Sequence, residues 1–339
     1  MPRVTHSRRS FLLSALPFVL SGQDTTFSTD VKVVNVLATV RNKQGQIVKN
    51  LTKDDFALEE DGRPQTIKYF SRETDLPLTL GLLIDTSGSQ RHVLGHERSA
   101  STRFIDQVIR EDKDMAFVIH FDFETELLQD LTPSRKKLRQ SIQNVEPPQL
   151  QRRQPGGGGG RQGRRGGGGT VLYDAVLLAS DELMRKQPGR KALIILSDGV
   201  DTGSRVSIGE AIESAQRADT LVYSILFFDE QAYGGQTGPV MGGRRRGAPP
   251  ARIPARNLPD GKKVLQRMSR ETGGGFFEVS RKVPIEETFE RIQEELRSQY
   301  NIGYSSDKQN AGAGFRSIRL TTTQKNMIVQ TRDRYYAVM

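Results

Sequence analysis

The chain has 339 residues, a formal net charge of +10 and no cysteine, which excludes disulfides, thiolate metal sites and a cysteine nucleophile. Its length allows one large domain with an accessory one, or two modest domains, and provides enough residues for a sizeable core. The 4 histidines are scattered and lack the spacing of a zinc site. His120, between Ile119 and Phe121, is interpreted as a strand residue rather than a ligand.

The first 22 residues have the order of an export signal. Ser7-Arg8-Arg9-Ser10-Phe11-Leu12 precedes a short apolar run that ends at Leu20, and the small residues Ser21 and Gly22 follow. This run is shorter than the roughly 20 residues that cross a bilayer. The paired arginines resemble a bacterial twin-arginine signal, a route that exports folded proteins. We therefore expect a signal peptide at residues 1–22 and a periplasmic, cell-surface or secreted protein; a retained basic helix or an uncleaved anchor is the alternative.

Residues 28–75 are predicted to be an N-terminal β segment. Residues 31–40 are rich in β-branched side chains and partly alternate between polar and apolar. Turn signals follow at residues 42–46 and at Asp61-Gly62, and a further strand is expected at residues 66–70.

From residue 78 onward, apolar strands alternate with helical patterns, which is the signature of βαβ units and a mainly parallel sheet. The continuous apolar run 78–84 suits a strand covered on both faces, and further strands are expected at residues 115–121, 192–196, 221–228 and 275–279. Helical patterns separate them, at residues 100–109, 134–145, 171–184, 207–215, 262–272 and 286–299. The alternation predicts an α/β sandwich over residues 77–299.

The C-terminal segment, residues 300–339, returns to a strand pattern at residues 300–304, 317–320 and 327–330. We expect these strands to pair with residues 28–75 in a small accessory β module.

Two basic segments interrupt the α/β part. Residues 151–169 and 231–257 each carry five arginines and no acidic residue. The Gly/Arg composition of the first resembles nucleic-acid-binding segments, but it has no interleaved aromatic residues for base stacking. Neither segment has the apolar residues needed to fold, and nucleic acid is not an expected partner. Two interpretations stay open: both are tolerated solvated insertions, or both lie on the metal-binding edge of the sheet and attract an acidic partner.

A polar cluster follows the first strand of the α/β part. Asp85, Ser87 and Ser89 come directly after the apolar run 78–84. In open α/β sheets, ligands bind outside the carboxyl ends of the strands, so this position predicts a site before any motif is considered.

The spacing Asp85-x-Ser87-x-Ser89, followed by Thr170 at the head of a predicted helix and by Asp198 after a buried strand, resembles a von Willebrand factor A (VWFA) domain. The resemblance covers roughly residues 77–299. It implies a Rossmann-like fold with a mainly parallel central sheet flanked by helices, and it implies that the five residues form a metal-ion-dependent adhesion site (MIDAS). With the N-terminal segment included, the chain is similar to the VWFA-related domain family of acidobacterial type.

The resemblance also implies a ligand set. Ser87, Ser89 and Thr170 would touch the metal directly in one state, with Asp85 and Asp198 bound directly or through water. Oxygen ligands of this kind suit a hard divalent cation such as Mg²⁺ or Mn²⁺. Few ligand charges would leave the ion able to accept a carboxylate from a partner, which is binding chemistry rather than turnover.

Each of these residues also has a purely structural interpretation. Asp85, Ser87 and Asp198 are common turn and cap residues, and Thr170 could serve only as an N-cap. Asp122 and Asp201 are expected to be turn residues rather than further ligands.

Three functions remain open from the sequence. The first is an exported, non-enzymatic module that captures an acidic protein or another carboxylate-bearing ligand through the metal. The second is a structural or assembly subunit of a cell-envelope complex, attached through the β module. The third is a metal-dependent hydrolase in which the cation acts as a Lewis acid, although no positioned base can be identified in the sequence.

Overall fold

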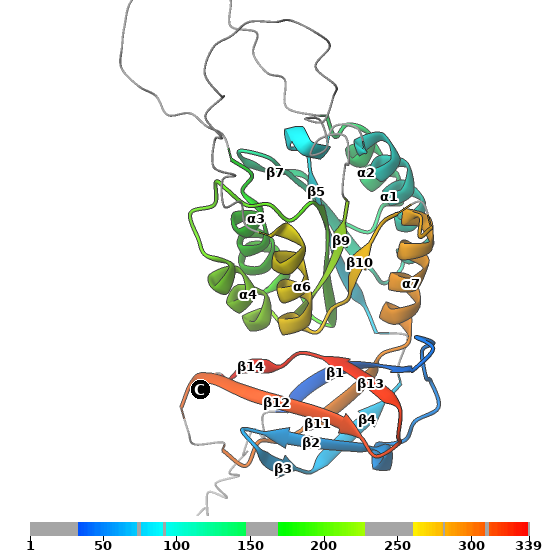
Figure 1. Cartoon of the computed structure of the whole chain (residues 1–339), viewed down its shortest axis with the longest axis vertical. Coiled ribbons are helices and arrows are strands. Elements are labelled where there is room, and N and C mark those ends of the chain that lie inside the picture. The colour runs from blue at the N-terminus through cyan, green and yellow to red at the C-terminus, as the bar shows by residue number, and fades with distance from the viewer. Residues whose placement is uncertain are drawn as a thin grey trace, which may run out of the picture. The chain divides into compact units, whose positions relative to one another are not determined.

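Six strands form the central sheet, in the order β10-β9-β8-β5-β6-β7 (Figure 1). Their bounds are β5 (Leu78–Asp85), β6 (Met115–Phe121), β7 (Thr125–Thr132), β8 (Arg190–Ser197), β9 (Thr220–Leu226) and β10 (Phe276–Glu278). All neighbouring strands are parallel except β6 and β7. Every residue of β5, β8 and β9 is buried, as expected for central strands that are covered on both faces.

This computed structural model describes residues 33–72, 76–90, 93–146, 169–227, 260–280, 282–308 and 312–337. Residues 32–339 form one compact unit. The expected signal peptide, the basic segment 231–257 and all of the segment 151–169 except Gly169 lie outside the described residues.

Helices cover both faces of the central sheet (Figure 1). One face packs against α1 (Leu94–Val108), α2 (Arg135–Gln143) and α7 (Ile285–Arg297). The other packs against α3 (Leu172–Leu178), α4 (Ile208–Arg217) and α6 (Gly261–Thr272). Each layer encloses its own apolar core, so residues that alternate along β5 and β8 enter different cores. A capping box opens α4, where Ser207 accepts a hydrogen bond from the Glu210 N–H.

Two expectations for the α/β part need correction. The helix expected at residues 171–184 is an α-helix only over Leu172–Leu178 and continues as a π-helix, η3 (Ala179–Met184). The edge strand β7 had no counterpart among the predicted strands. This edge strand is only partly buried, and its register shifts against β6. Its sequence, TELLQDLT, therefore does not need to alternate strictly between polar and apolar residues, and it gave no strand signal.

The terminal segments form two small antiparallel sheets, in the orders β13-β1-β11-β4 and β14-β12-β2-β3. Their bounds are β1 (Val34–Asn42), β2 (Phe56–Glu60), β3 (Arg63–Gln65), β4 (Ile67–Ser71), β11 (Tyr300–Tyr304), β12 (Gly314–Thr322), β13 (Met327–Thr331) and β14 (Arg334–Ala337). A 3₁₀ turn, η1 (Lys53–Asp55), precedes β2. We call these sheets the β module. A third apolar core lies within the β module. The sheets and helices confirm the expected α/β fold class with a small accessory β module.

The hairpin between β2 and β3 shows how the sequence specifies a turn. Asp61 and Gly62 have φ values of 47° and 76°, and Glu60 pairs with Arg63 across the hairpin. Two successive left-handed residues are what a two-residue hairpin turn requires, and Asp-Gly is a favoured pair for it. The Asp61-Gly62 turn signal therefore marks the tip of this hairpin.

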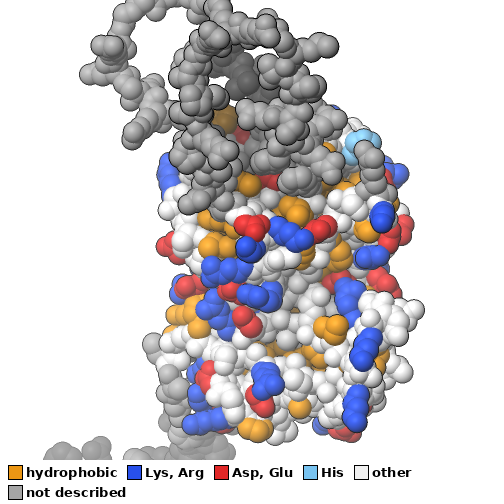
Figure 2. Space-filling view, viewed as in Figure 1, with side chains coloured by type: hydrophobic (Ala, Val, Ile, Leu, Met, Phe, Trp, Pro, Cys, Tyr) orange, Lys and Arg blue, Asp and Glu red, His pale blue; other side chains and the backbone are white. Residues whose placement is uncertain are grey.

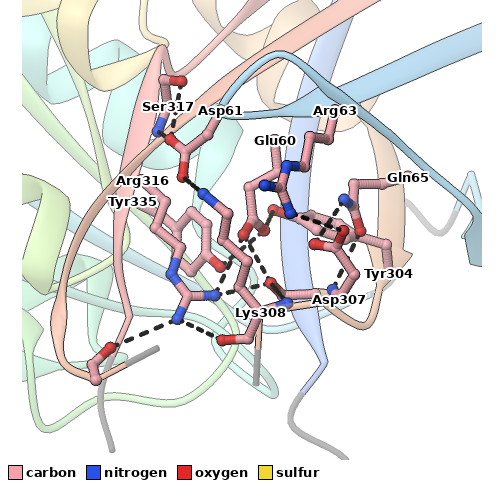
Figure 3. Close-up of polar contacts among 12 residues, drawn as sticks. Glu60, Asp61, Arg63, Gln65, Tyr304, Asp307, Lys308, Arg316, Ser317 and Tyr335 are labelled. Atoms are coloured by element: carbon pink, nitrogen blue, oxygen red, sulfur yellow. Dashed lines mark hydrogen bonds and ion pairs between the residues drawn. The ribbon is translucent and has the colours of Figure 1, made fainter. Parts of the chain in front are cut away.

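A buried carboxylate network ties β2 to the C-terminal strands (Figure 3). Glu60 is 0% exposed, and its carboxylate accepts hydrogen bonds from Tyr304 Oη at 2.7 Å, Tyr335 Oη at 3.0 Å and Ser306 Oγ at 2.6 Å. The Arg316 guanidinium lies 3.2 Å from the same carboxylate. Burial and the hydrogen bond to Glu60 raise the pKa of Tyr304 above its ordinary value, which keeps this donor protonated.

Ion pairs connect the β module to the α/β domain. They are Arg41 with Glu295, Lys49 with Glu294, Arg332 with Asp219, and Arg334 with Glu271. Over the face of the α/β domain shown in Figure 2, basic and acidic side chains are interspersed.

Candidate metal centre

Asp85 is the last residue of β5 and is 0% exposed. Its Oδ1 accepts a hydrogen bond from the Ser87 N–H at 2.9 Å, and its Oδ2 accepts one from Ser197 Oγ at 2.6 Å. These two donors come from the adjoining loop and from the neighbouring strand β8. They fix the carboxylate at the carboxyl edge of the sheet, where the sequence placed a site.

The two serines of the motif connect this loop to the end of β8. Ser87 Oγ lies 3.0 Å from Ser89 Oγ, and Ser89 Oγ donates to Asp198 Oδ2 at 2.7 Å. Asp198 directly follows β8 and is 5% exposed. Because β5 and β8 are neighbours in the sheet, their ends bring Asp85, Ser87, Ser89 and Asp198 into one cluster.

Thr170 lies at the same edge but is held through its backbone. Its carbonyl accepts hydrogen bonds from the N–H groups of Thr202 and Gly203 at 3.1 and 3.0 Å. The approach is so close that a Cβ on Gly169 would lie 2.3 Å from Thr202 Oγ1. Among the described residues, the Thr170 hydroxyl forms no hydrogen bond with the other four side chains. The N-cap of α3 is Val171, so the interpretation of Thr170 as an N-cap is wrong.

Asp122 and Asp201 stabilise the surrounding loops. Asp122 Oδ1 accepts from the Glu124 N–H at 3.0 Å, within the turn between β6 and β7. Asp201 Oδ2 accepts from Ser204 Oγ at 2.5 Å and from the Tyr173 N–H at 3.1 Å, in the first turn of α3. Both carboxylates therefore have structural partners of their own.

His120 lies on β6, as the sequence indicates. Its Nδ1 is 3.3 Å from Thr86 Oγ1 and its Nε2 is 3.0 Å from the Glu126 carboxylate. The ring thus connects the end of β5 to β7.

The electrostatics of the cluster favour a positive ion. Burial and, to a smaller extent, the charge of Asp198 together raise the pKa of Asp85 to about 7, against the opposing effect of the hydrogen bonds from Ser197 and Ser87. A buried carboxylate next to another one is costly to ionise without a compensating charge. A bound cation would supply that charge.

Glu97 on α1 is a further acidic group that the sequence analysis missed. It is 0% exposed, and neither carboxylate oxygen has a hydrogen-bond partner within the part of the chain that the structure describes. Burial raises the pKa of Glu97 well above its ordinary value, and the charges of Asp85 and Asp198 raise it further. Helical spacing could have revealed it, because Glu97 shares a face with the buried residues Ser101 and Phe104.

Ser197 is the second residue that was missed. It is fully buried, and it donates to Asp85 while accepting from the Gly199 N–H at 2.9 Å. Its sequence signal was its place directly before Asp198 at the end of a buried strand.

The donor set fits a hard divalent cation. Asp85 and Asp198 offer carboxylate oxygens, and Ser87 and Ser89 offer hydroxyl oxygens, which are the ligands that Mg²⁺ and Mn²⁺ prefer. Across the described ranges, no group of three or more His, Cys, Asp or Glu residues is placed to hold a metal ion. Hydroxyl ligands are therefore essential to any metal site here.

No family model and no curated protein matches this sequence. Solved structures with similarity include BatB, a conserved hypothetical protein from Bacteroides thetaiotaomicron, with 14% identity and a TM-score of 0.44 over 65% of this chain and 97% of that one. Proximal thread matrix protein 1 of the mussel byssus, solved with a zinc-occupied MIDAS motif, has 13% identity and a TM-score of 0.46 over 70% of this chain and 49% of that one. The vWF domain of the type V pili tip protein Mfa5 from Porphyromonas gingivalis has 20% identity and a TM-score of 0.30 over 38% of this chain and 39% of that one.

These TM-scores are low, so the assignment of the fold rests on the strand order and connections described above. Within the described residues, no helix combines the length and the apolar character needed to cross a bilayer. The sheet order, the helices on both faces and the loop 85–89 at the end of β5 give this chain a Rossmann-like α/β domain with a mainly parallel central sheet.

Proposed function

We propose that this protein is an exported binding module that captures an acidic group of its partner through a divalent cation. The proposed ligands are Asp85, Ser87, Ser89, Thr170 and Asp198. The observation that carries the proposal is the hydrogen-bonded chain from Ser87 through Ser89 to Asp198, beside the buried carboxylate of Asp85. It gathers oxygen donors at the sheet edge where ligands bind in open α/β folds.

The charge balance supports a cation at this position. Asp85, Asp198 and Glu97 are buried and electrostatically coupled, and no basic side chain among the described residues forms an ion pair with Asp85 or Glu97. When bound, Mg²⁺ or Mn²⁺ would offset this charge and provide a position that accepts a carboxylate oxygen of the partner. Ser197 and the Ser87 N–H hold Asp85 in place for that role.

The buried position of Glu97, the third acidic residue near the site, favours binding over turnover. Glu97 is coupled to the two aspartates, but its full burial keeps its carboxylate away from a bound partner. A general base must come within hydrogen-bond reach of the proton that it removes, and Glu97 has no such access from this position.

The arginine-rich segments would add attraction for an acidic partner. Gly169, the last residue of the first segment, packs against Thr202. Gly261 comes four residues after the second segment, and a Cβ on it would lie 2.1 Å from the Asp198 carbonyl oxygen. The last residue of the first segment and a residue that follows the second segment therefore lie beside the candidate site. Ten arginines attached there would raise the local positive potential.

A calorimetric titration of the protein with Mg²⁺ and with Mn²⁺ tests the metal site. Asp85→Ala is expected to abolish binding while the protein stays folded, because a loop ligand contributes little to the apolar cores. Asp54→Ala, which removes an exposed carboxylate in the β module, is the matched control and should bind like the wild type. Unchanged binding by Asp85→Ala would sink the site assignment.

Capture of the partner is tested separately. The mature protein should retain an acidic protein from envelope extract in Mg²⁺ and release it when the metal is chelated. Retention that survives both chelation and Asp85→Ala would instead favour an assembly role for the β module, and turnover removed by Asp85→Ala would favour the hydrolase.

A further inference from the structure

A cavity of about 300 Å³ lies at the junction between the β module and the α/β domain. It opens at the amino-terminal ends of β8 and β9, the opposite edge of the sheet from Asp85 and Asp198. The residues that matter for its chemistry are Arg190, Lys191, Gln216, Asp219, Asn301 and Arg332. We call it the junction cavity. It is separate from the candidate metal centre.

Three buried cations line the junction cavity. Arg190, Lys191 and Arg332 are 6, 8 and 8% exposed. Arg190 donates to the Leu76 carbonyl at 2.9 Å, and Arg332 donates to the Asn35 carbonyl at 2.7 Å and pairs with Asp219. Asp219 is the only acidic residue in the described lining, so the lining carries two net positive charges.

Lys191 differs from the two arginines. Its ammonium forms no hydrogen bond or ion pair with any described residue, although the residue is almost fully buried. Burial lowers the pKa of Lys191, and the charge of Asp219 opposes that effect. Partial desolvation of an ammonium without a hydrogen-bonded partner carries a free-energy cost, which an anion in the junction cavity would offset.

Other polar atoms in the lining also lack partners among the described residues. Gln216 is 2% exposed, and its Oε1 has no hydrogen bond, while its Nε2 donates to the Glu271 carbonyl at 2.7 Å. The Oδ1 of Asn301 and the Nε of Arg332 are likewise buried without partners in the described structure. Buried polar atoms are nearly always satisfied in folded proteins. Several unsatisfied atoms around one cavity indicate that a polar molecule fills it.

We propose that the junction cavity binds a small dianion of the phosphate or dicarboxylate class, with Lys191 as its principal cationic contact. A dianion matches the net charge of the lining. The amide oxygens of Gln216 and Asn301 would accept from a protonated phosphate oxygen or from a hydroxyl of the ligand. Because the cavity is lined by strands of both parts of the chain, the ligand would also bind the β module to the α/β domain.

Calorimetry of the full mature chain with inorganic phosphate and with succinate, each against a chloride background, tests the proposal and distinguishes the two anion classes. Binding of either probe is expected. Lys191→Met keeps the aliphatic stem but removes the charge, and it should weaken binding about tenfold to a hundredfold, the usual effect of losing a charge-assisted hydrogen bond. Lys325→Met removes an exposed charge in the β module and should bind like the wild type.

Thermal unfolding separates a ligand site from a merely structural lysine. Without the probe, Lys191→Met should melt at a higher temperature than the wild type, because a partly desolvated ammonium without a hydrogen-bonded partner is gone. With the probe, only the wild type and Lys325→Met should gain stability. Asn301→Asp, which adds a negative charge at nearly constant volume, should also lose the gain. Failure of both anions to bind at about 1 mM, or equal binding by Lys191→Met, overturns the proposal.

Discussion

The hydroxyl of Ser89 donates to a carboxylate oxygen of Asp198 at 2.7 Å, across 109 residues of sequence. This contact couples the loop after β5 to the loop after β8. A change in either loop should therefore alter the oxygen positions available to a cation.

The stability of the metal-free protein should depend on pH through Asp85. Its pKa is about 7 in the folded state and 3.8 ordinarily, so ionisation of Asp85 opposes folding. The penalty is absent below about 3.8, grows as the pH rises, and is complete above about 7. In chelator, the wild type should thus melt at a higher temperature at about pH 6 than at about pH 8, and Asp85→Asn should reduce that difference, with the remainder due to Glu97, whose pKa is also raised by burial. Equal pH slopes for the two proteins would contradict the assignment.

Gly261→Ala should weaken metal binding although residue 261 is not a ligand. A Cβ there would lie 2.1 Å from the Asp198 carbonyl oxygen, so the Asp198 loop must shift. We expect a loss of affinity for Mn²⁺ of at least about tenfold, or 1.4 kcal/mol, by calorimetry. The control is Gly95→Ala near the start of α1, where a Cβ meets nothing within 4 Å. It should stabilise the fold by up to about 1 kcal/mol and leave affinity unchanged. Parallel behaviour of the two variants would argue against the coupling.

Arg316→Met should destabilise the β module because it leaves the carboxylate of Glu60 buried without its cation. The expected loss is about 3–5 kcal/mol in urea unfolding. Arg319→Met is the matched control, since Arg319 lies 3.8 Å from Glu59 on the exposed face of the neighbouring strands, and its loss should be below about 1 kcal/mol. Similar losses in the free energy of unfolding for both variants would show that the buried network around Glu60 stabilises the fold no more than an exposed ion pair does.

Replacement of Arg8-Arg9 by Lys-Lys should keep the precursor in the cytoplasm, because the twin-arginine route depends on the arginine pair. Fractionation followed by immunoblotting measures this. Normal export of the Lys-Lys variant would remove the twin-arginine interpretation and leave general export open.

Replacement of residues 151–168 and 231–257 by Gly-Ser linkers should slow association with an acidic ligand such as polyglutamate. Gly169 must be retained, because a side chain there would clash with Thr202. Positive potential beside the site speeds encounter, and salt screens this effect over about 8 to 10 Å. The variant should therefore show a weaker salt dependence of its on-rate in stopped-flow experiments. An unchanged rate and slope would mean that the segments are only tolerated insertions.

The sequence predicts those strands whose residues are all buried to the same extent along their length. β5, β8 and β9 are buried along their whole length, so their apolar runs are unambiguous. The edge strand β7 has a mixed environment and gave no clear pattern. The sequence analysis also missed the short strand β14. Tyr335 is buried and the Tyr336 ring contacts the Arg217 guanidinium, and four residues are too few to show an alternation of polar and apolar side chains.

The candidate site divides in the same way. The resemblance to a VWFA domain, carried by the spacing of Asp85, Ser87 and Ser89, implied that Asp198 would lie beside them, and Ser89 donates a hydrogen bond to Asp198. Glu97 and Lys191 were not found, because a charged residue on a helix face or at the start of a strand is normally solvated. The burial of Lys191 follows from packing against elements distant in sequence, whereas the burial of Glu97 was indicated only by its helical spacing from Ser101 and Phe104.

The pairing of β1 with β11 and β13 has a consequence for synthesis. Val36 pairs with Ile302, and Val40 pairs with Val329. The first strand of the β module therefore stays unpaired until the C-terminal strands have been synthesised. At roughly 5–20 residues per second, this interval is of the order of 10 to 50 s on the ribosome. The α/β domain can complete its sheet during that time, whereas β1, β2 and β4 keep open hydrogen-bonding edges. Any chaperone that holds residues 34–71 in this interval competes with residues 300–337 for the same edges.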